Sequence, residues 1–199
     1  MTNMKKTSFL TVALVITAAA FLSISLTGCG TSKQTTATHQ QAQQQSVPQE
    51  INPAVAANTS VLSIKDAALL LNNPEKADSI ARANGYTVIN RYGVYRVENY
   101  ARMLYKNCTP AKSMSKNLYN DTPKPRKKGT SSYVAMMPDG AESIIIGVFN
   151  TATYQNLVEQ VKTGGFTLDM AGDEDAYTNG RYNVYCYSGR KTVRIEKVR

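Results

Sequence analysis

Few residues of this 199-residue sequence have side chains that could do chemistry. Its only histidine, His39, lies in a segment rich in Gln, Thr and Ala, which we expect to be a solvated tail. The part of the chain that we expect to fold has no His, which excludes Ser-His-Asp and Cys-His catalysis and His-ligated metal sites. Cys108 and Cys186 are too few for a structural zinc site, which is built from Cys and His ligands alone. The sequence therefore predicts no catalytic residue, no metal site and no cofactor.

The acidic residues offer only a weak alternative. Asp173, Glu174 and Asp175 could give oxygen ligands to Ca²⁺, but they lack the alternating spacing of a calcium loop, so we expect a solvated acidic loop. Other acids, such as Glu142 and Glu159, are not placed by the sequence as a pair facing a cleft, as glycoside hydrolysis requires. An enzyme that acts through carboxylates is our third functional hypothesis.

The N-terminus has the organisation of a secretory signal peptide. Residues 1–8 carry Lys5 and Lys6 and no acid, and residues 9–26 carry no charge. An apolar run of this length could also span a bilayer as a helix. The small residues that end the run before Cys29 favour a cleaved leader, residues 1–28, over a transmembrane helix.

The end of the apolar run, Leu26-Thr27-Gly28-Cys29, resembles the lipobox of bacterial lipoproteins. The resemblance covers residues 1–29. It implies cleavage before Cys29, lipidation of the Cys29 sulfur and an acylated N-terminus, so that the lipid anchors the protein in a membrane. Gly30 in place of Asp implies the outer membrane, and the absence of an acidic run after Cys29 implies a protein that faces the periplasm.

Composition divides the rest of the chain into a tether and one domain. Residues 29–60 are rich in Gln, Thr, Ala and Ser, so we expect a disordered tether that cannot bury enough surface to offset its chain entropy. We expect a single folded domain at residues 61–199. In the oxidising compartment that the leader implies, Cys108 and Cys186 could form a disulfide, and the alternative is two separate buried thiols.

Positive charge is concentrated in one segment of the chain. Without the leader the chain has 21 basic and 14 acidic residues, and residues 102–128 hold eight of these basic residues and one acid. We expect a basic loop at 108–130 that contacts an anionic polymer or lipid headgroups, or that is a solvated flexible connection. A nucleic-acid partner is not expected, because the run lacks interleaved aromatic residues. The candidate contact residues are Lys124, Arg126, Lys127 and Lys128.

The chain has twelve tyrosines and no tryptophan. Tyr185 and Tyr187 alternate along a predicted strand, and together with Tyr92 and Tyr100 they could form an exposed aromatic ladder. Exposed aromatic faces bind sugars and partner proteins. The alternative is that these tyrosines are cross-strand packing pairs.

Periodic patterns predict helices at 64–73, 74–84 and 154–163, and hairpins between them. The expected hairpin turns are Glu98-Asn99, Pro138-Asp139-Gly140 and Ser188-Gly189. The expected helix N-caps are Ser63, Asn73 and either Thr151 or Thr153.

Two stretches of the predicted domain are similar to each other. Residues 92–95, YGVY, align with 182–185, YNVY, and Gly85-Tyr86-Thr87 aligns with Gly165-Phe166-Thr167. We predict two α-β-β-β repeats, at about 61–107 and 131–199, that make an α+β fold, an antiparallel sheet with helices on one face. Chance similarity between two hairpins rich in Tyr and Val is the alternative.

Residues 143–166 resemble the opening of sporulation-related repeat (SPOR) domains, which bind peptidoglycan glycan. The matching residues are Gly147-Val148-Phe149 and Gly165-Phe166. The chain then departs from the family, because it ends in a hairpin where that family has another helix.

The sequence therefore predicts an outer-membrane-anchored lipoprotein with a non-catalytic domain that binds or scaffolds an envelope protein. A peptidoglycan-binding module is the alternative. The basic loop and the tyrosines are the candidate contacts.

Overall fold

The computed structural model describes residues 50–95, 98–112, 122–137 and 143–199. The predicted leader, Cys29, most of the predicted tether and the Pro138-Asp139-Gly140 turn lie outside these residues. Among the described residues, no helix combines the length and the apolar composition needed to cross a membrane.

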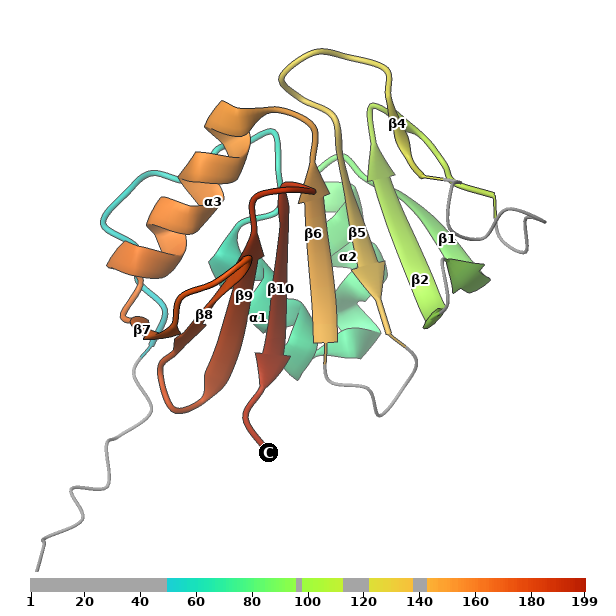
Figure 1. Ribbon diagram of the computed structural model, residues 1–199. Coiled ribbons are helices and arrows are strands. Elements are labelled where there is room, and N and C mark those ends of the chain that lie inside the picture. The colour runs from blue at the N-terminus through green and yellow to red at the C-terminus, as the bar shows by residue number, and fades with distance from the viewer. Residues whose placement is uncertain (1–49, 96–97, 113–121, 138–142) are drawn as a thin grey trace, which may run out of the picture. The chain divides into compact units, whose positions relative to one another are not determined.

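Eight strands form one antiparallel sheet (Figure 1), in the order β1-β2-β5-β6-β10-β9-β8-β7. A short ladder of β3 and β4 stands beside it. The large sheet and three α-helices confirm the predicted α+β class. The strands are β1 (Thr87–Tyr95), β2 (Glu98–Lys106), β3 (Cys108–Thr109), β4 (Lys124–Pro125), β5 (Ser132–Met136), β6 (Ser143–Val148), β7 (Thr167–Met170), β8 (Glu174–Thr178), β9 (Tyr182–Tyr187) and β10 (Thr192–Lys197). The helices are α1 (Ile64–Asn72), the 3₁₀ helix η1 (Pro74–Lys76), α2 (Ala77–Ala83) and α3 (Thr151–Thr163).

The helix starts follow local capping chemistry. The Ser63 hydroxyl accepts a hydrogen bond from the Asp66 amide, as predicted, and begins α1. Asn73 occupies the N-cap position of η1, as predicted, but its side chain makes no capping hydrogen bond there and donates to the Leu69 carbonyl at the end of α1. The prediction for α3 is wrong, since the Asn150 side chain accepts from the Thr153 amide and so begins the helix at Thr151.

The sheet consists of two meanders that meet at its centre. One runs from the edge strand β1 through β2 and β5 to β6, and the other from the edge strand β7 through β8 and β9 to β10. Gly85 and Gly165, with φ of 74° and 88°, end the helices α2 and α3 that precede the edge strands. Both glycines adopt the left-handed conformation typical of a residue just past a helix end. The aligned motifs Gly85-Tyr86-Thr87 and Gly165-Phe166-Thr167 therefore occupy corresponding places.

The two aligned hairpins, by contrast, do not occupy corresponding places in the sheet. It equates β1 and β2 with β9 and β10, but the first pair begins at an edge of the sheet and the second pair reaches its centre. The predicted turn at Glu98-Asn99 is also wrong, because both residues lie in β2, opposite Tyr95 and Val94. The predicted turn at Ser188-Gly189 does join β9 to β10.

Side chains from all three α-helices pack with one set of strand residues in the larger core cluster. This cluster holds Leu70 from α1, Ala81 from α2 and Leu157 from α3, together with strand residues such as Ile146 and Val193. Each of these five side chains is almost completely buried. The cross-strand partners Val193 and Ile146 bring β10 and β6 into this cluster.

The folded domain begins earlier than predicted, before residue 61. Ile51 is only 5% exposed and belongs to the larger core cluster. The Asn58 amide donates to the Asn156 side chain on α3 at 3.0 Å, and the Asn156 side chain donates to the Ala56 carbonyl. One apolar residue and two amide side chains thus hold a segment whose composition alone predicts disorder.

The two cysteines of the domain are unbonded. Cys186 lies in the larger core cluster, whereas Cys108 lies in a second cluster built around tyrosines. The predicted disulfide is not formed, and the alternative of two separate buried thiols is correct. Burial raises the pKa of the Cys108 thiol to about 11 and that of the Cys186 thiol to about 12.

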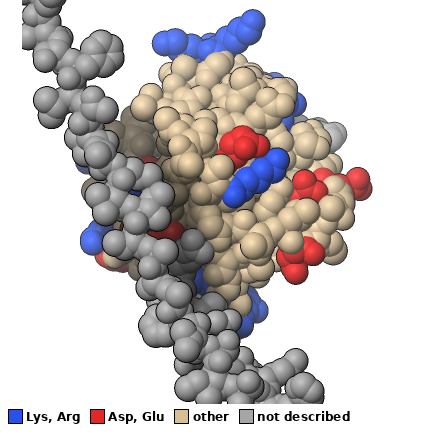
Figure 2. Space-filling model, turned by 90° about the vertical axis from the view of Figure 1, so that its left-hand side faces the viewer, with Lys and Arg blue, Asp and Glu red and all other residues tan. Residues whose placement is uncertain are grey.

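The side of the molecule that carries α3 and β7 is mostly uncharged, with Lys, Arg, Asp and Glu scattered over it (Figure 2). On β7 itself, Leu168 and Met170 are large apolar residues that are more than half exposed. Asp169 lies between them and is also exposed.

Candidate functional site

The second core cluster gathers tyrosines on the sheet. Its strand residues include Met103 and Ala135, which pair across β2 and β5 with side chains pointing away from the helices' cluster. The rings of Tyr95 and Tyr100 lie 5.9 Å apart, and those of Tyr95 and Tyr133 lie 6.4 Å apart, edge to face. These separations are typical of attractive aromatic pairs. The buried tyrosines of the cluster are Tyr92, Tyr95, Tyr100 and Tyr105.

A glycine allows one of these rings to lie flat across the sheet. Tyr133 of β5 is directly opposite Gly147 of β6. A Cβ atom at residue 147 would stand 2.1 Å from two atoms of the Tyr133 ring, far inside van der Waals contact. The same ring packs against Phe149 at a centroid distance of 6.0 Å. Gly147 and Phe149, two residues of the SPOR resemblance, therefore position Tyr133.

Two adjoining cavities lie over this face of the sheet, and together we call them the tyrosine groove. They have volumes of about 380 and 570 Å³ and share Glu98 and Ile145 as lining residues. The first is lined by Tyr95, Glu98, Tyr100, Tyr133, Ala135, Ile145, Glu174, Tyr187, Arg190 and Thr192. The second is lined by Glu98, Met137, Ser143, Ile145, Asn183, Arg194, Glu196, Lys197 and Arg199.

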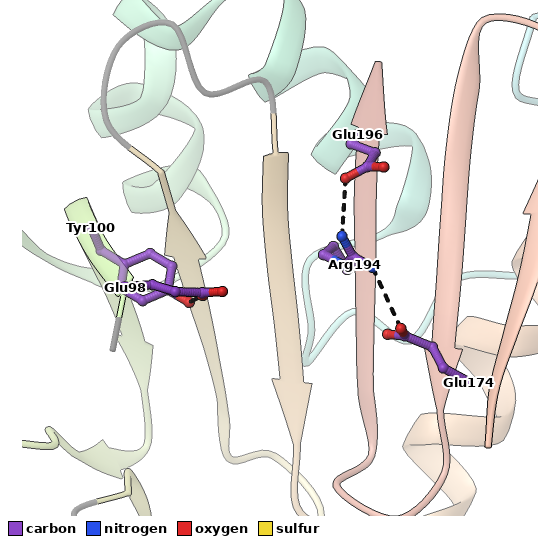
Figure 3. A network of polar contacts seen from close by, with 5 residues as sticks. All are labelled: Glu98, Tyr100, Glu174, Arg194 and Glu196. Carbon is purple, nitrogen blue, oxygen red and sulfur yellow. Dashed lines mark hydrogen bonds and ion pairs between the residues drawn. The ribbon is translucent and has the colours of Figure 1, made fainter. Parts of the chain in front are cut away.

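Arg194 is the centre of a polar network in the tyrosine groove (Figure 3). Its guanidinium donates to Glu196 at 3.1 Å and to Glu174 at 3.4 Å. The same group lies 4.0 Å from the centroid of the Tyr185 ring, a cation–π contact. These three contacts fix the guanidinium in place and leave its charge balanced by two carboxylates.

Glu98 and Tyr100 lie side by side on β2, across the groove from Arg194 (Figure 3). The Tyr100 hydroxyl donates to the Glu98 carboxylate. Burial raises the pKa of Tyr100, and the hydrogen bond to Glu98 raises it further. The pKa of Tyr185 is raised in the same way, first by burial and then by Glu196. A tyrosine hydroxyl is protonated at neutral pH in any case, and these shifts extend that state to higher pH.

Tyr185 and Tyr187, two of the predicted contacts, do lie on this face. Both are half-buried on β9, where Arg194 covers one ring and Arg190 lies 6.0 Å from the centroid of the other. Tyr187 lines the tyrosine groove. The other tyrosines on this face pack against one another, and Tyr92 and Tyr100 are buried. The alternative of packing pairs therefore describes this face better than an exposed ladder does.

The predicted basic contacts lie elsewhere. Lys124 is in β4, and Lys124, Arg126, Lys127 and Lys128 are exposed. None of the four lines the tyrosine groove. Arg126 and Lys127 instead line another cavity, of about 570 Å³, beside β1 and β2. The structure thus separates the two groups of candidate contacts.

Several residues of the groove are absent from the sequence-based prediction. Glu98 was assigned to a turn and Glu174 to an acidic loop, but they lie in β2 and β8. Arg194 and Glu196 alternate with the buried Val193 and Ile195, a pattern that places both charges on one face of a strand. This alternation was the one available signal for the network.

The described residues contain no group of three or more His, Cys, Asp or Glu side chains that could hold a metal ion. Comparison of the chain with protein-family models, with curated proteins and with solved structures finds no match.

Proposed function

We propose that this protein is a lipid-anchored component of the bacterial cell envelope whose domain binds a protein partner, without catalysis, through the tyrosine groove. The observation that carries the proposal is the groove itself, in which tyrosine rings lie beside a polar network. Tyr and Arg are, with Trp, enriched at the centres of binding interfaces. A tyrosine buries a large area at a small cost in side-chain entropy.

The polar groups of the groove favour binding over chemistry. Arg194 is already paired with Glu174 and Glu196, and the Glu98 carboxylate already accepts a hydrogen bond from Tyr100. Groups held in this way give a partner defined donors and acceptors. The tyrosine hydroxyls, whose pKa values are raised, do not supply a base at neutral pH.

The proposal includes the arrangement of the sheet. In it the helices cover one face and the other face carries the tyrosine groove. The two meanders, each preceded by a helix, are then copies of an α-β-β-β-β unit, one strand longer than the unit predicted from the sequence. The positions of the two Gly-aromatic-Thr motifs, each before an edge strand, support this duplication.

The test is a pull-down with the acylated protein from detergent-solubilised envelopes. The groove variant carries Glu98→Ser and Tyr187→Ser, both at exposed or half-buried sites. The control variant carries Glu159→Ser and Leu168→Ser, two exposed residues of α3 and β7. We expect the groove variant to lose a protein partner by about tenfold or more, since interface centres carry most of the binding energy. The control variant should retain it.

Retention of the same partner by the groove variant would overturn the proposed site. A turnover of an envelope substrate that Glu98→Gln abolishes would overturn the absence of catalysis. The anchor is tested separately by mass spectrometry of the mature N-terminus, where a Cys29 without lipid would contradict it.

Peptidoglycan binding is the second candidate function. It is favoured by one observation, that Gly147 and Phe149 of the SPOR resemblance hold Tyr133 in the groove. Sedimentation with purified sacculi distinguishes the two candidates. A chain that stays in the supernatant at low salt is not a peptidoglycan-binding module, whereas a chain that sediments only with an intact groove is.

A further inference from the structure

We propose that Arg126 and Lys127 form a second binding site, separate from the tyrosine groove, for the phosphodiester headgroup of an anionic phospholipid. Both residues line the cavity of about 570 Å³ beside β1 and β2. This inference goes beyond the proposed function, because it concerns a different surface and a different ligand. The other residues that line the cavity are Thr87, Ile89, Tyr105, Asn107, Cys108 and Pro110.

The backbone of the site is fixed by hydrogen bonds. The buried Ser131 hydroxyl oxygen accepts from the amides of Arg126 and Lys127, at 3.2 and 3.0 Å. It also lies 2.6 Å from the Asn107 carbonyl and 2.7 Å from that of Lys127. The Arg126 amide donates to the Asn107 carbonyl at 2.8 Å as well. The described part of the basic loop is therefore an ordered structure, and the alternative of a flexible connection does not apply to it.

The charge of the site is uncompensated within the described part of the chain. Lys124, Arg126, Lys127 and Lys128 take part in none of its ion pairs. None of the lining residues of the cavity in that part is acidic. Four cations on a fixed loop therefore create a local positive potential that favours an anion. The guanidinium of Arg126 can bind phosphate oxygens in a bidentate manner, which a lysine cannot.

The residues that line the cavity favour a ligand larger than inorganic phosphate. Ile89 and Pro110 are apolar, and Tyr105 offers a ring beside the two cations. An apolar wall next to a positive rim suits a ligand whose phosphate is joined to a hydrocarbon or glycerol group. Phospholipid headgroups have this chemistry.

The length of chain outside the described domain places such lipids within reach, a step that rests on the proposed anchor. Cys29 precedes Glu50, the first described residue, by 21 positions. A chain of that length spans at most about 70 Å. Basic segments close to a membrane are attracted to the negative potential of its anionic lipids. The loop would therefore hold the domain against the membrane that the lipid anchors it in.

Calorimetry on the full acylated chain in uncharged detergent micelles tests the inference. The probe is dihexanoyl phosphatidylglycerol, compared with dihexanoyl phosphatidylcholine, with inorganic phosphate and with titrations into empty micelles. The site variant carries Arg126→Ser and Lys127→Ser. The control variant carries Lys76→Ser and Arg82→Ser, which remove the same charge from exposed residues of η1 and α2.

We expect the wild type to bind the anionic probe about tenfold more tightly than either comparison ligand, and the site variant to lose this preference. Added salt should weaken the wild-type interaction by screening. The control and groove variants should bind as the wild type does, which separates this result from any failure of the proposed function.

Three outcomes would overturn the inference. They are equal affinity for the two lipids, unchanged binding by the site variant, and binding of inorganic phosphate as tight as that of the anionic lipid. The last would replace the headgroup site with a site for small anions.

Discussion

At the scale of single residues, the tyrosine groove depends on the absence of a side chain. Gly147 lies under the ring of Tyr133, and any Cβ there would overlap that ring. The glycine is not required for its backbone conformation, since Gly147 is not among the positive-φ glycines. Its requirement is steric, and it follows from the residue opposite it on β5.

This gives a prediction for Gly147→Ala. We expect the substitution to lower the free energy of unfolding by about 1–3 kcal/mol, because an added methyl group in a packed site forces neighbours off their rotamers. It should also weaken partner binding, since Tyr133 lines the groove. Denaturant unfolding measures the first effect.

A second variant separates sterics from other causes. In a Tyr133→Ala background the clash is gone, so Gly147→Ala should then cost little stability. An equal cost in both backgrounds would show that the ring is not the reason for the glycine.

Also at the residue scale, buried acids whose pKa values are higher in the folded than in the unfolded chain predict a loss of stability at alkaline pH. Burial raises the thiol pKa values of Cys108 and Cys186 from 9.0 to about 11 and about 12, and that of the Tyr154 hydroxyl from 10.0 to about 12. In each case the folded state holds its proton at a pH where the unfolded state releases it. The stabilisation is complete below pH 9 and is lost as the pH rises from 9 to 12.

Denaturant unfolding at several pH values checks this. We expect the free energy of unfolding to be constant, as far as these groups contribute, up to about pH 9 and then to fall. The Cys186→Ala variant should show a shallower fall than the wild type. An identical slope in the two proteins would contradict the assignment to this thiol.

At the scale of elements, a small number of contacts holds the N-terminal segment of the domain against the core and α3. Ile51 is buried in the larger core cluster. The Asn156 side chain on α3 accepts a hydrogen bond from the Asn58 amide and donates one to the Ala56 carbonyl. We expect Ile51→Ala to cost about 2–5 kcal/mol, as for other buried large-to-small substitutions. Thermal or denaturant unfolding measures it. The exposed Leu69→Ala is the matched control and should have little effect.

The elements also show how far sequence reasoning could go. The α3 helix and the final hairpin were predicted because Leu157 and Val161 recur at helical spacing and Val193 and Ile195 alternate. Glu98 was assigned to a turn, but it is the first residue of β2. The error arose because polar residues at the end of an edge hairpin resemble a turn in the sequence. The Asn150 cap was missed because Thr151 and Thr153, which follow it within three residues, are also of a type that caps helices.

The site was harder to predict than the fold. The tyrosines were recognised by their number, but which strands lie side by side decides which rings meet. Tyr133 and Tyr95 are on β5 and β1, which are separated by β2 in the sheet. Arg194 and Glu174 lie on β10 and β8, which both pair with β9, and their ion pair crosses that strand. Such long-range pairing leaves no local pattern in a sequence.

At the scale of the whole molecule, the proposed surfaces lie apart on one domain. The tyrosine groove spans strands from both meanders, whereas the basic site is built beside β1, β2 and the short β3–β4 ladder. A partner in the groove and a lipid headgroup at the loop therefore need not compete.

The central pairing of β6 with β10 has a consequence for biogenesis. The strand that completes the sheet is the last in the chain, and until it arrives β6 has one unsatisfied edge carrying three consecutive isoleucines, Ile144, Ile145 and Ile146. A chain that emerges N-terminus first thus exposes an apolar, unpaired strand edge until β10 has been synthesised. The sheet closes only then, and the interval before it is the period in which early misassembly would occur.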